Sequence, residues 1–247
     1  DSKGGLVAAA DIQWDHISCV GSHSFVWAGD ELWMVYHQNK DRQAGGDMNR
    51  AYAAERVELV KNEDGLTLLK AMGPTYSPQP KPEIATGYKN LAPMADIKVK
   101  NMLKGSSIDY LTDGLVQVQQ NEIFGQFEGN KKVTITLDFD EYVTARALLI
   151  YNSCYYEDAF YKVDRIDFSF RKTIDGKLCN GVARVDGLYY NFDRYVDLDY
   201  EVMRPGAPLI IEFDDMEIDQ VTITITCPNG QESIAISEIM LMGKEND

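Results

Sequence analysis

The four cysteines are the side chains in this sequence with the most distinctive chemistry. They are Cys19, Cys154, Cys179 and Cys227, and no two of them form a Cys-x-x-Cys pair. A zinc ribbon needs such pairs, so this class of metal site is excluded. Two interpretations stay open: buried free thiols, or one disulfide such as Cys154–Cys179 if the protein is exported.

Carboxylates near the start of the chain are the second group that could do chemistry. Asp11, Asp15, Asp30 and Glu31 fall at predicted turns or in the irregular first stretch. Acidic side chains at such places are by default solvated loop residues. We therefore assign none of them a catalytic role.

The charge of the chain limits its partners. The formal net charge is −15, of which residues 1–90 contribute −3 and residues 91–247 contribute −12. Such an acidic surface repels phosphate backbones, so nucleic acid is not an expected partner, whereas neutral ligands or cations fit. No apolar run approaches the roughly eighteen residues that a membrane span requires.

The first five residues, Asp1 to Gly5, lack the basic and then apolar layout of a signal peptide. We expect either that a targeting region was removed or that the chain begins inside a longer protein.

A break in composition predicts two units. All three tryptophans and all three histidines lie within the first 37 residues, whereas ten of the 14 tyrosines lie between Tyr110 and Tyr200. Between them, residues 74–82 hold four of the eight prolines, which predicts an extended connector. We expect units at 1–73 and 90–247, joined by a proline-rich linker at 74–89.

The first unit shows four strand signals, at residues 24–27, 31–37, 48–60 and 66–70, with a hairpin turn at Ala28-Gly29-Asp30. Four antiparallel strands match one blade of a β-propeller. One blade cannot bury its own faces, so we expect it to pack on the second unit or on further blades. Trp27 and Trp33, at strand spacing, are predicted core residues, and His16 and His37 are predicted structural residues.

The second unit is also predicted to be all-β. Alternating apolar and polar residues recur at 133–139, 147–151, 163–170, 208–213, 221–227 and 234–241, separated by turn signals such as Asp175-Gly176. This spacing is typical of a β-sandwich or jelly roll.

Two stretches of the first unit resemble a known family. Gly21-Ser-His-Ser-Phe25 with Glu31-Leu-Trp-Met-Val-Tyr-His37, followed by Arg56-Val-Glu-Leu and Asn62-Glu-Asp-Gly65, resemble the last part of glycoside hydrolase family 43 propellers. The resemblance covers roughly residues 15–82 and implies the last blade of a five-bladed propeller.

The chemistry implied by this resemblance is inverting glycoside hydrolysis, which needs two carboxylates across the scissile bond. In the family these come from earlier blades, and no position here matches them, so we predict no catalytic residue in this chain. The family's matching histidine points into the central channel, which makes His23 a candidate for the active-site floor; the alternative is a histidine satisfied by hydrogen bonds. Trp14 is a second candidate for that floor.

The second unit is similar to discoidin (coagulation-factor type C) domains and to carbohydrate-binding modules of family 32. Four motifs carry this similarity in order: Asn90-Leu-Ala, Leu111-Thr-Asp-Gly114, the strand from Val133 to Phe139, and Ile236-Ser-Glu-Ile239 with Gly243. The similarity implies a galactose-binding-like β-sandwich over residues 90–247.

Many members of that group hold one structural calcium. Asp113 and Glu238 match the family's side-chain ligands, and backbone carbonyls from Leu115 to Gln119 would complete the site. The alternatives are a turn residue for Asp113 and an exposed or salt-bridged strand residue for Glu238.

Sugar binding by such a module uses an exposed aromatic ring with flanking polar groups. The candidates are Tyr155, Tyr156, Tyr189, Tyr190, Asn152 and Arg184. In a strand, one tyrosine of each pair would instead face the core, and the module would then serve as a spacer.

Two functions follow from these similarities. The first is the C-terminal part of a secreted, periplasmic or cell-surface glycoside hydrolase that degrades arabinose- or xylose-type polysaccharides. Its own residues would be non-catalytic, and its partners would be plant-type or host glycans and the missing upstream blades. The alternative is a stand-alone carbohydrate-binding or structural and adhesion module.

Overall fold

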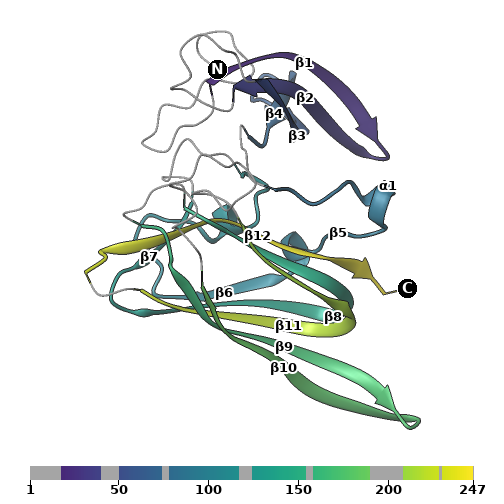
Figure 1. Cartoon of the computed structure of the whole chain (residues 1–247), viewed down its shortest axis with the longest axis vertical. Coiled ribbons are helices and arrows are strands. Elements are labelled where there is room, and N and C mark those ends of the chain that lie inside the picture. Colours follow the sequence, from purple (N-terminus) through teal and green to yellow (C-terminus); the bar gives the residue numbers. More distant parts are fainter. Residues whose placement is uncertain are drawn as a thin grey trace.

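The computed structural model describes residues 18–39, 50–73, 78–116, 124–153, 158–189, 208–227 and 230–246. Within these ranges the chain is all-β, as predicted, and it forms a four-stranded sheet and a β-sandwich (Figure 1). The helical segments described are short: α1 (Glu83–Thr86), η1 (Ala92–Met94) and η2 (Ile108–Leu111). Among the described helices, none is long and apolar enough to cross a membrane.

The four-stranded sheet is an antiparallel meander in chain order. Its strands are β1 (Ser18–Ala28), β2 (Glu31–Asn39), β3 (Arg50–Lys61) and β4 (Thr67–Ala71). The predicted hairpin turn is confirmed: Ala28 pairs with Glu31, and Gly29 has a φ of 66°. A positive φ of this kind is readily adopted by glycine, which explains the sharp turn between β1 and β2.

The sandwich contains the remaining strands. They are β5 (Lys89–Asn90), β6 (Asp96–Lys100), β7 (Gly125–Glu128), β8 (Lys132–Asn152), β9 (Lys162–Ile174), β10 (Lys177–Tyr189), β11 (Pro208–Thr226) and β12 (Ser233–Glu245). The main path runs β10-β9-β11-β8-β12-β5, with β6 paired to β8 and β7 paired to β12. The linker region predicted at 74–89 contains α1 and the first residue of β5.

Two strands belong to both layers of the sandwich. The first half of β8 pairs with β6 and with the second half of β11, whereas its second half pairs with β12 and with the first half of β11. Register shifts between Glu212 and Met216 and between Ile218 and Gln220 mark the bend in β11. Such irregularities bend a strand and let it change sheets.

The core lies between the two layers. One layer contributes fully buried residues such as Ile135, Leu137 and Ile223, and the other contributes residues such as Ile150 and Leu241. The alternating patterns seen in the sequence place these side chains inward and the threonines between them outward.

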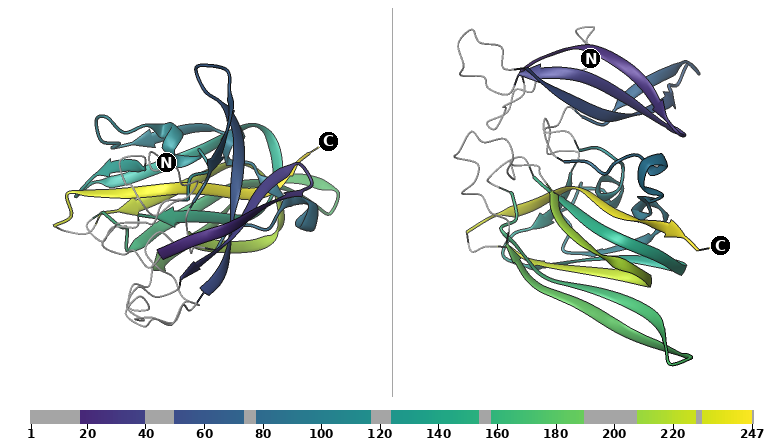
Figure 2. Two further views of the ribbon diagram at one scale, coloured as in Figure 1. Left: turned by 90° about the horizontal axis from the view of Figure 1, so that it is seen from above. Right: turned by 45° about the vertical axis from the view of Figure 1, so that its right-hand side comes forward.

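The second layer is apolar on its outer face as well. Ala147, Leu149, Tyr151, Met240 and Met242 form a separate buried cluster there, and most of β12 is therefore buried on both faces. A strand apolar on both sides needs cover on both sides. The connector supplies part of that cover, since the Tyr151 hydroxyl donates a hydrogen bond to the Pro78 carbonyl at 2.8 Å. The four-stranded sheet lies beyond the connector (Figure 2).

Candidate functional site

Asp113 and Glu238 come together although they are 125 positions apart in the sequence. Asp113 lies in the turn that follows η2, where Gly114 has a φ of 80°, and Glu238 lies in β12 and is fully buried. The Gly114 amide donates to Glu238 Oε2 at 3.1 Å, and the Leu115 amide donates to Asp113 Oδ1 at 2.9 Å. The turn is thus held by both carboxylates.

The surroundings of Asp113 and Glu238 disfavour the state in which both carboxyl groups are ionised. Burial raises the pKa of Glu238 well above its usual value, and the nearby Asp113 carboxylate adds to that rise. Burial also raises the pKa of Asp113. Glu238 Oε1 is buried and has no hydrogen-bond partner among the described residues. A buried carboxylate oxygen without a partner is costly, and natural proteins rarely retain one without a reason.

A hard divalent cation fits this donor set. Calcium takes carboxylate and backbone carbonyl oxygens, and its charge would favour the ionised form of both acids. Glu238 Oε1 is the buried acceptor that such an ion would use. Among the described residues, no three His, Cys, Asp or Glu side chains are grouped as a metal centre, so carbonyls would have to supply the remaining ligands. The predicted donors at 117–119 lie outside the described residues.

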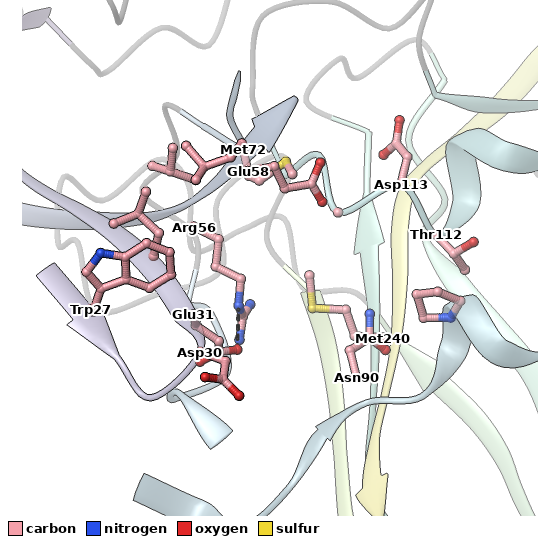
Figure 3. Close-up of a pocket in the computed structure, with 15 residues that line it drawn as sticks. Trp27, Asp30, Glu31, Arg56, Glu58, Met72, Asn90, Thr112, Asp113 and Met240 are labelled. Carbon is pink, nitrogen blue, oxygen red and sulfur yellow. Dashed lines mark hydrogen bonds and ion pairs between the residues drawn. The ribbon is translucent and has the colours of Figure 1, made fainter. Parts of the chain in front are cut away.

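A cleft of about 640 Å³ opens beside the carboxylate pair, between the four-stranded sheet and the sandwich. Figure 3 shows Trp27, Glu31 and Arg56 on one side and Asn90, Thr112 and Asp113 on the other. Arg56 is already engaged: its Nε lies 3.3 Å from Glu31 Oε1, and its guanidinium carbon lies 4.8 Å from the centroid of the Trp33 ring.

Two core predictions in the four-stranded sheet have different outcomes. Trp33 is buried, as expected, because Arg56 covers it. Trp27 was expected in the core, and that prediction is wrong: its side chain is 59% exposed and lines the cleft. The reason is its position on β1, an edge strand of this sheet.

The sugar-binding candidates that the structure describes do not form one cluster. Tyr189 is 72% exposed at the end of β10, with the Lys162 ammonium 5.2 Å from its ring centroid. Arg184 lies five residues earlier, roughly 16 Å along a strand, and is ion-paired with Asp167 at 2.6 Å. Tyr155, Tyr156 and Tyr190 lie outside the described residues.

Asn152 has a structural position. Its side chain is fully buried, its Nδ2 donates to the Phe160 carbonyl at 2.8 Å, and its Oδ1 accepts from the Ser153 and Phe160 amides at 2.9 Å. These bonds tie the end of β8 to the segment before β9. The side chain does not reach the surface, which fits a structural role and not contact with a sugar.

Replacing Asn152 with alanine is expected to lower the free energy of unfolding by about 2–3 kcal/mol, because buried amide and carbonyl groups of Phe160 would lose their partners. Urea denaturation would measure this. Asn180→Ala, at an exposed position on β10, is the matched control and should change stability by less than about 0.5 kcal/mol. Equal stability of the two variants would contradict the structural role.

The other predicted residues are placed as follows. His23 is exposed on β1, with its ring edge-on to Phe25 at a centroid distance of 5.5 Å. Trp14 lies outside the described residues. Cys179 is exposed and free, and Cys227 is buried and free.

Glu58, Arg56 and Met72 border the same cleft and were not predicted as site residues, although Arg56 and Glu58 belong to a motif that carries the resemblance to family 43 propellers. Each reads locally as an ordinary strand or connector residue. Only the docking of the four-stranded sheet beside η2 brings them near Asp113, so no local signal could have found them.

Comparison with known proteins gives distant structural similarities. No family model and no curated protein matches this chain. The chain is similar to the family 32 carbohydrate-binding module of Clostridium perfringens NanJ, solved in complex with galactose, at 8% identity and a TM-score of 0.42, covering 63% of this chain and 98% of that one.

Two further structures show the same level of similarity. One is a GH31 module, CBM32-2, bound to GalNAc, at 16% identity and a TM-score of 0.38, covering 60% of this chain and 97% of that one. The other holds the CBM32-1 and CBM32-2 domains of C. perfringens ZmpB in complex with GalNAc, at 13% identity and a TM-score of 0.43, covering 64% of this chain and 35% of that one. The strand pairing of this chain itself defines its β-sandwich.

Proposed function

We propose that this chain is a carbohydrate-binding β-sandwich, stabilised by a structural calcium ion at Asp113 and Glu238, in a protein that acts on extracellular polysaccharides. The buried Glu238 oxygen without a hydrogen-bond partner, beside a second carboxylate, is the observation that carries the calcium site. The ordered sequence motifs from Asn90 to Gly243 support the binding class.

Glycan binding would use the exposed end of β10 around Tyr189. Tyr189 offers a mostly exposed ring for the C–H face of a sugar, and the Lys162 ammonium beside it can donate to hydroxyls. Galactose-, N-acetylgalactosamine-, arabinose- and xylose-containing glycans are the ligands to test.

The four-stranded sheet supports a second part of the proposal, that it is the last blade of a glycosidase-like propeller whose catalytic carboxylates lie on other blades. Both of its edge strands expose large apolar side chains. Phe25 and Trp27 on β1 are 41% and 59% exposed, and Leu68 and Leu69 on β4 are 46% and 38% exposed. Apolar edges of this kind fit a sheet that packs beside others. In this proposal the chain itself binds and does not hydrolyse.

A glycan array followed by calorimetry on the full chain tests the binding function. Tyr189→Ala is expected to weaken binding of the best glycan about tenfold, because a stacked ring contributes on the order of 1–2 kcal/mol. Tyr52→Ala is the matched control, since Tyr52 is 91% exposed on the four-stranded sheet. Flat titrations against all four glycan classes would overturn the carbohydrate-binding proposal.

A further inference from the structure

The turn at Asp113–Val116 is shared by the sandwich and the four-stranded sheet. On the sandwich side, Glu238 accepts the Gly114 amide. On the other side, the Val116 amide donates to the Met72 carbonyl at 2.9 Å, directly after β4. The Met72 amide in turn donates to the Arg56 carbonyl in β3 at 3.0 Å. A continuous path of hydrogen bonds therefore joins Glu238 to β3 through this turn.

Packing at the turn reinforces this path. A Cβ placed on Gly114 would lie 3.6 Å from the Met72 methyl carbon and 3.7 Å from its sulfur, so the Met72 side chain sits in ordinary contact distance of the turn. Met72 is itself buried. The turn therefore cannot shift without disturbing the residue that follows β4.

Charged groups of the four-stranded sheet face the same turn. Glu58 of β3 lines the cleft together with Asp113, and Figure 3 shows the two carboxylates on its facing walls. Lys70 of β4 pairs with Glu58 in register, with their charged atoms 3.9 Å apart.

We propose that the cation held by Asp113 and Glu238 also fastens the four-stranded sheet to the sandwich, with Glu58 as a third negative charge facing the ion across the cleft. This inference rests on the calcium site proposed above. Glu58 acts through its charge and not as a ligand, because its side chain is about half exposed and does not group with the other two carboxylates. Lys70 carries a positive charge beside Glu58, so its ammonium group should weaken binding of the cation.

Calcium titration by calorimetry on the full chain tests this proposal. Glu58→Gln should weaken calcium binding about three- to fivefold, which is the effect of one facing charge across a partly hydrated gap. Lys70→Gln should strengthen binding by a similar factor. Glu63→Gln removes the same charge at an exposed turn of the same sheet and should leave the affinity unchanged.

Amide hydrogen exchange measures whether calcium fastens the four-stranded sheet to the sandwich. Calcium should slow amide exchange in residues 113–116 and also in residues 67–73 of the wild-type chain. In Glu58→Gln, at a calcium concentration that saturates both proteins, the protection of 67–73 should be smaller while that of 113–116 remains.

The outcomes separate the two proposals. If calcium binds with protection confined to the sandwich, and Glu58→Gln binds like wild type, the fastening role is overturned and the calcium site stands. If the wild-type chain binds no calcium, both the site and the fastening role are overturned. Loss of affinity in Glu63→Gln equal to that in Glu58→Gln would show a general charge effect and would also overturn the role of Glu58.

Discussion

Calcium is expected to raise the thermal unfolding midpoint of the full chain by about 5–10 °C over the value in EDTA. A ligand at a hundredfold excess over its Kd stabilises a native state by about 2.7 kcal/mol, and each kcal/mol shifts a chain of this size by about 2–4 °C. The physical source is the buried pair: the ion would neutralise Glu238 and Asp113 and give Glu238 Oε1 a partner.

Glu238→Gln should remove this calcium response. In EDTA the variant is expected to melt no lower than the wild type, because a neutral amide in the same place carries no charge against Asp113. Asp140→Asn is the matched control, since Asp140 is an exposed carboxylate in β8, and it should retain the full shift. Calorimetric melts of the three proteins with and without calcium are the measurement. A wild-type midpoint that is the same in calcium and EDTA would disprove the site.

Gly243→Ala is expected to lower the free energy of unfolding by about 3 kcal/mol or more. A Cβ at this position would lie 2.4 Å from the Thr144 carbonyl oxygen and 2.7 Å from Leu91 Cδ1. Gly243 pairs with β8 on one side and β5 on the other, so β12 cannot move away from either neighbour. Overpacking against backbone atoms is relieved only by displacing the strand.

Gly21→Ala provides the comparison for this prediction. Gly21 is also in a strand, but a Cβ there would lie 3.6 Å from the nearest His37 ring atom, which is an ordinary contact. Its effect should remain within about 0.5 kcal/mol. Urea unfolding of both variants measures the difference, and similar values for the two would show that the close approach at Gly243 is not constraining.

Most of the long strands followed from local patterns, but several elements of the sandwich did not. Residues 133–139 and 147–151 were expected as separate strands, as were 208–213 and 221–227, but each pair is one long strand that bends between layers. The sequence shows a break in alternation at such a bend, and a break in alternation looks the same as a loop. β10 was not predicted as a strand, because its outward positions carry exposed residues such as Leu178 and Asn180 and its alternation is weak. β5, β6 and β7 were not predicted either, because strands of two to five residues are too short to show a clear alternation.

The residues of the candidate site were likewise predicted only in part. Asp113 and Glu238 were selected by resemblance, and the structure brings them to one turn. From the sequence, Asn152 was expected to be a surface polar residue after a strand. In the structure its side chain is buried and makes three hydrogen bonds. Burial of a single polar side chain depends on what the neighbouring segments do, and the local sequence does not contain that information.

The sequence by itself determined the all-β class, the two sheet systems and the hairpin at Gly29, because hydrophobic alternation and turn chemistry are local properties of the chain. Only the tertiary structure decided that the turn after η2 lies between β12 and the end of β4, and that Glu238 is buried there with one oxygen unpartnered. Those facts depend on contacts between residues 44 positions apart for Met72 and Val116 and 124 positions apart for Gly114 and Glu238, which no pattern of neighbouring residues can encode.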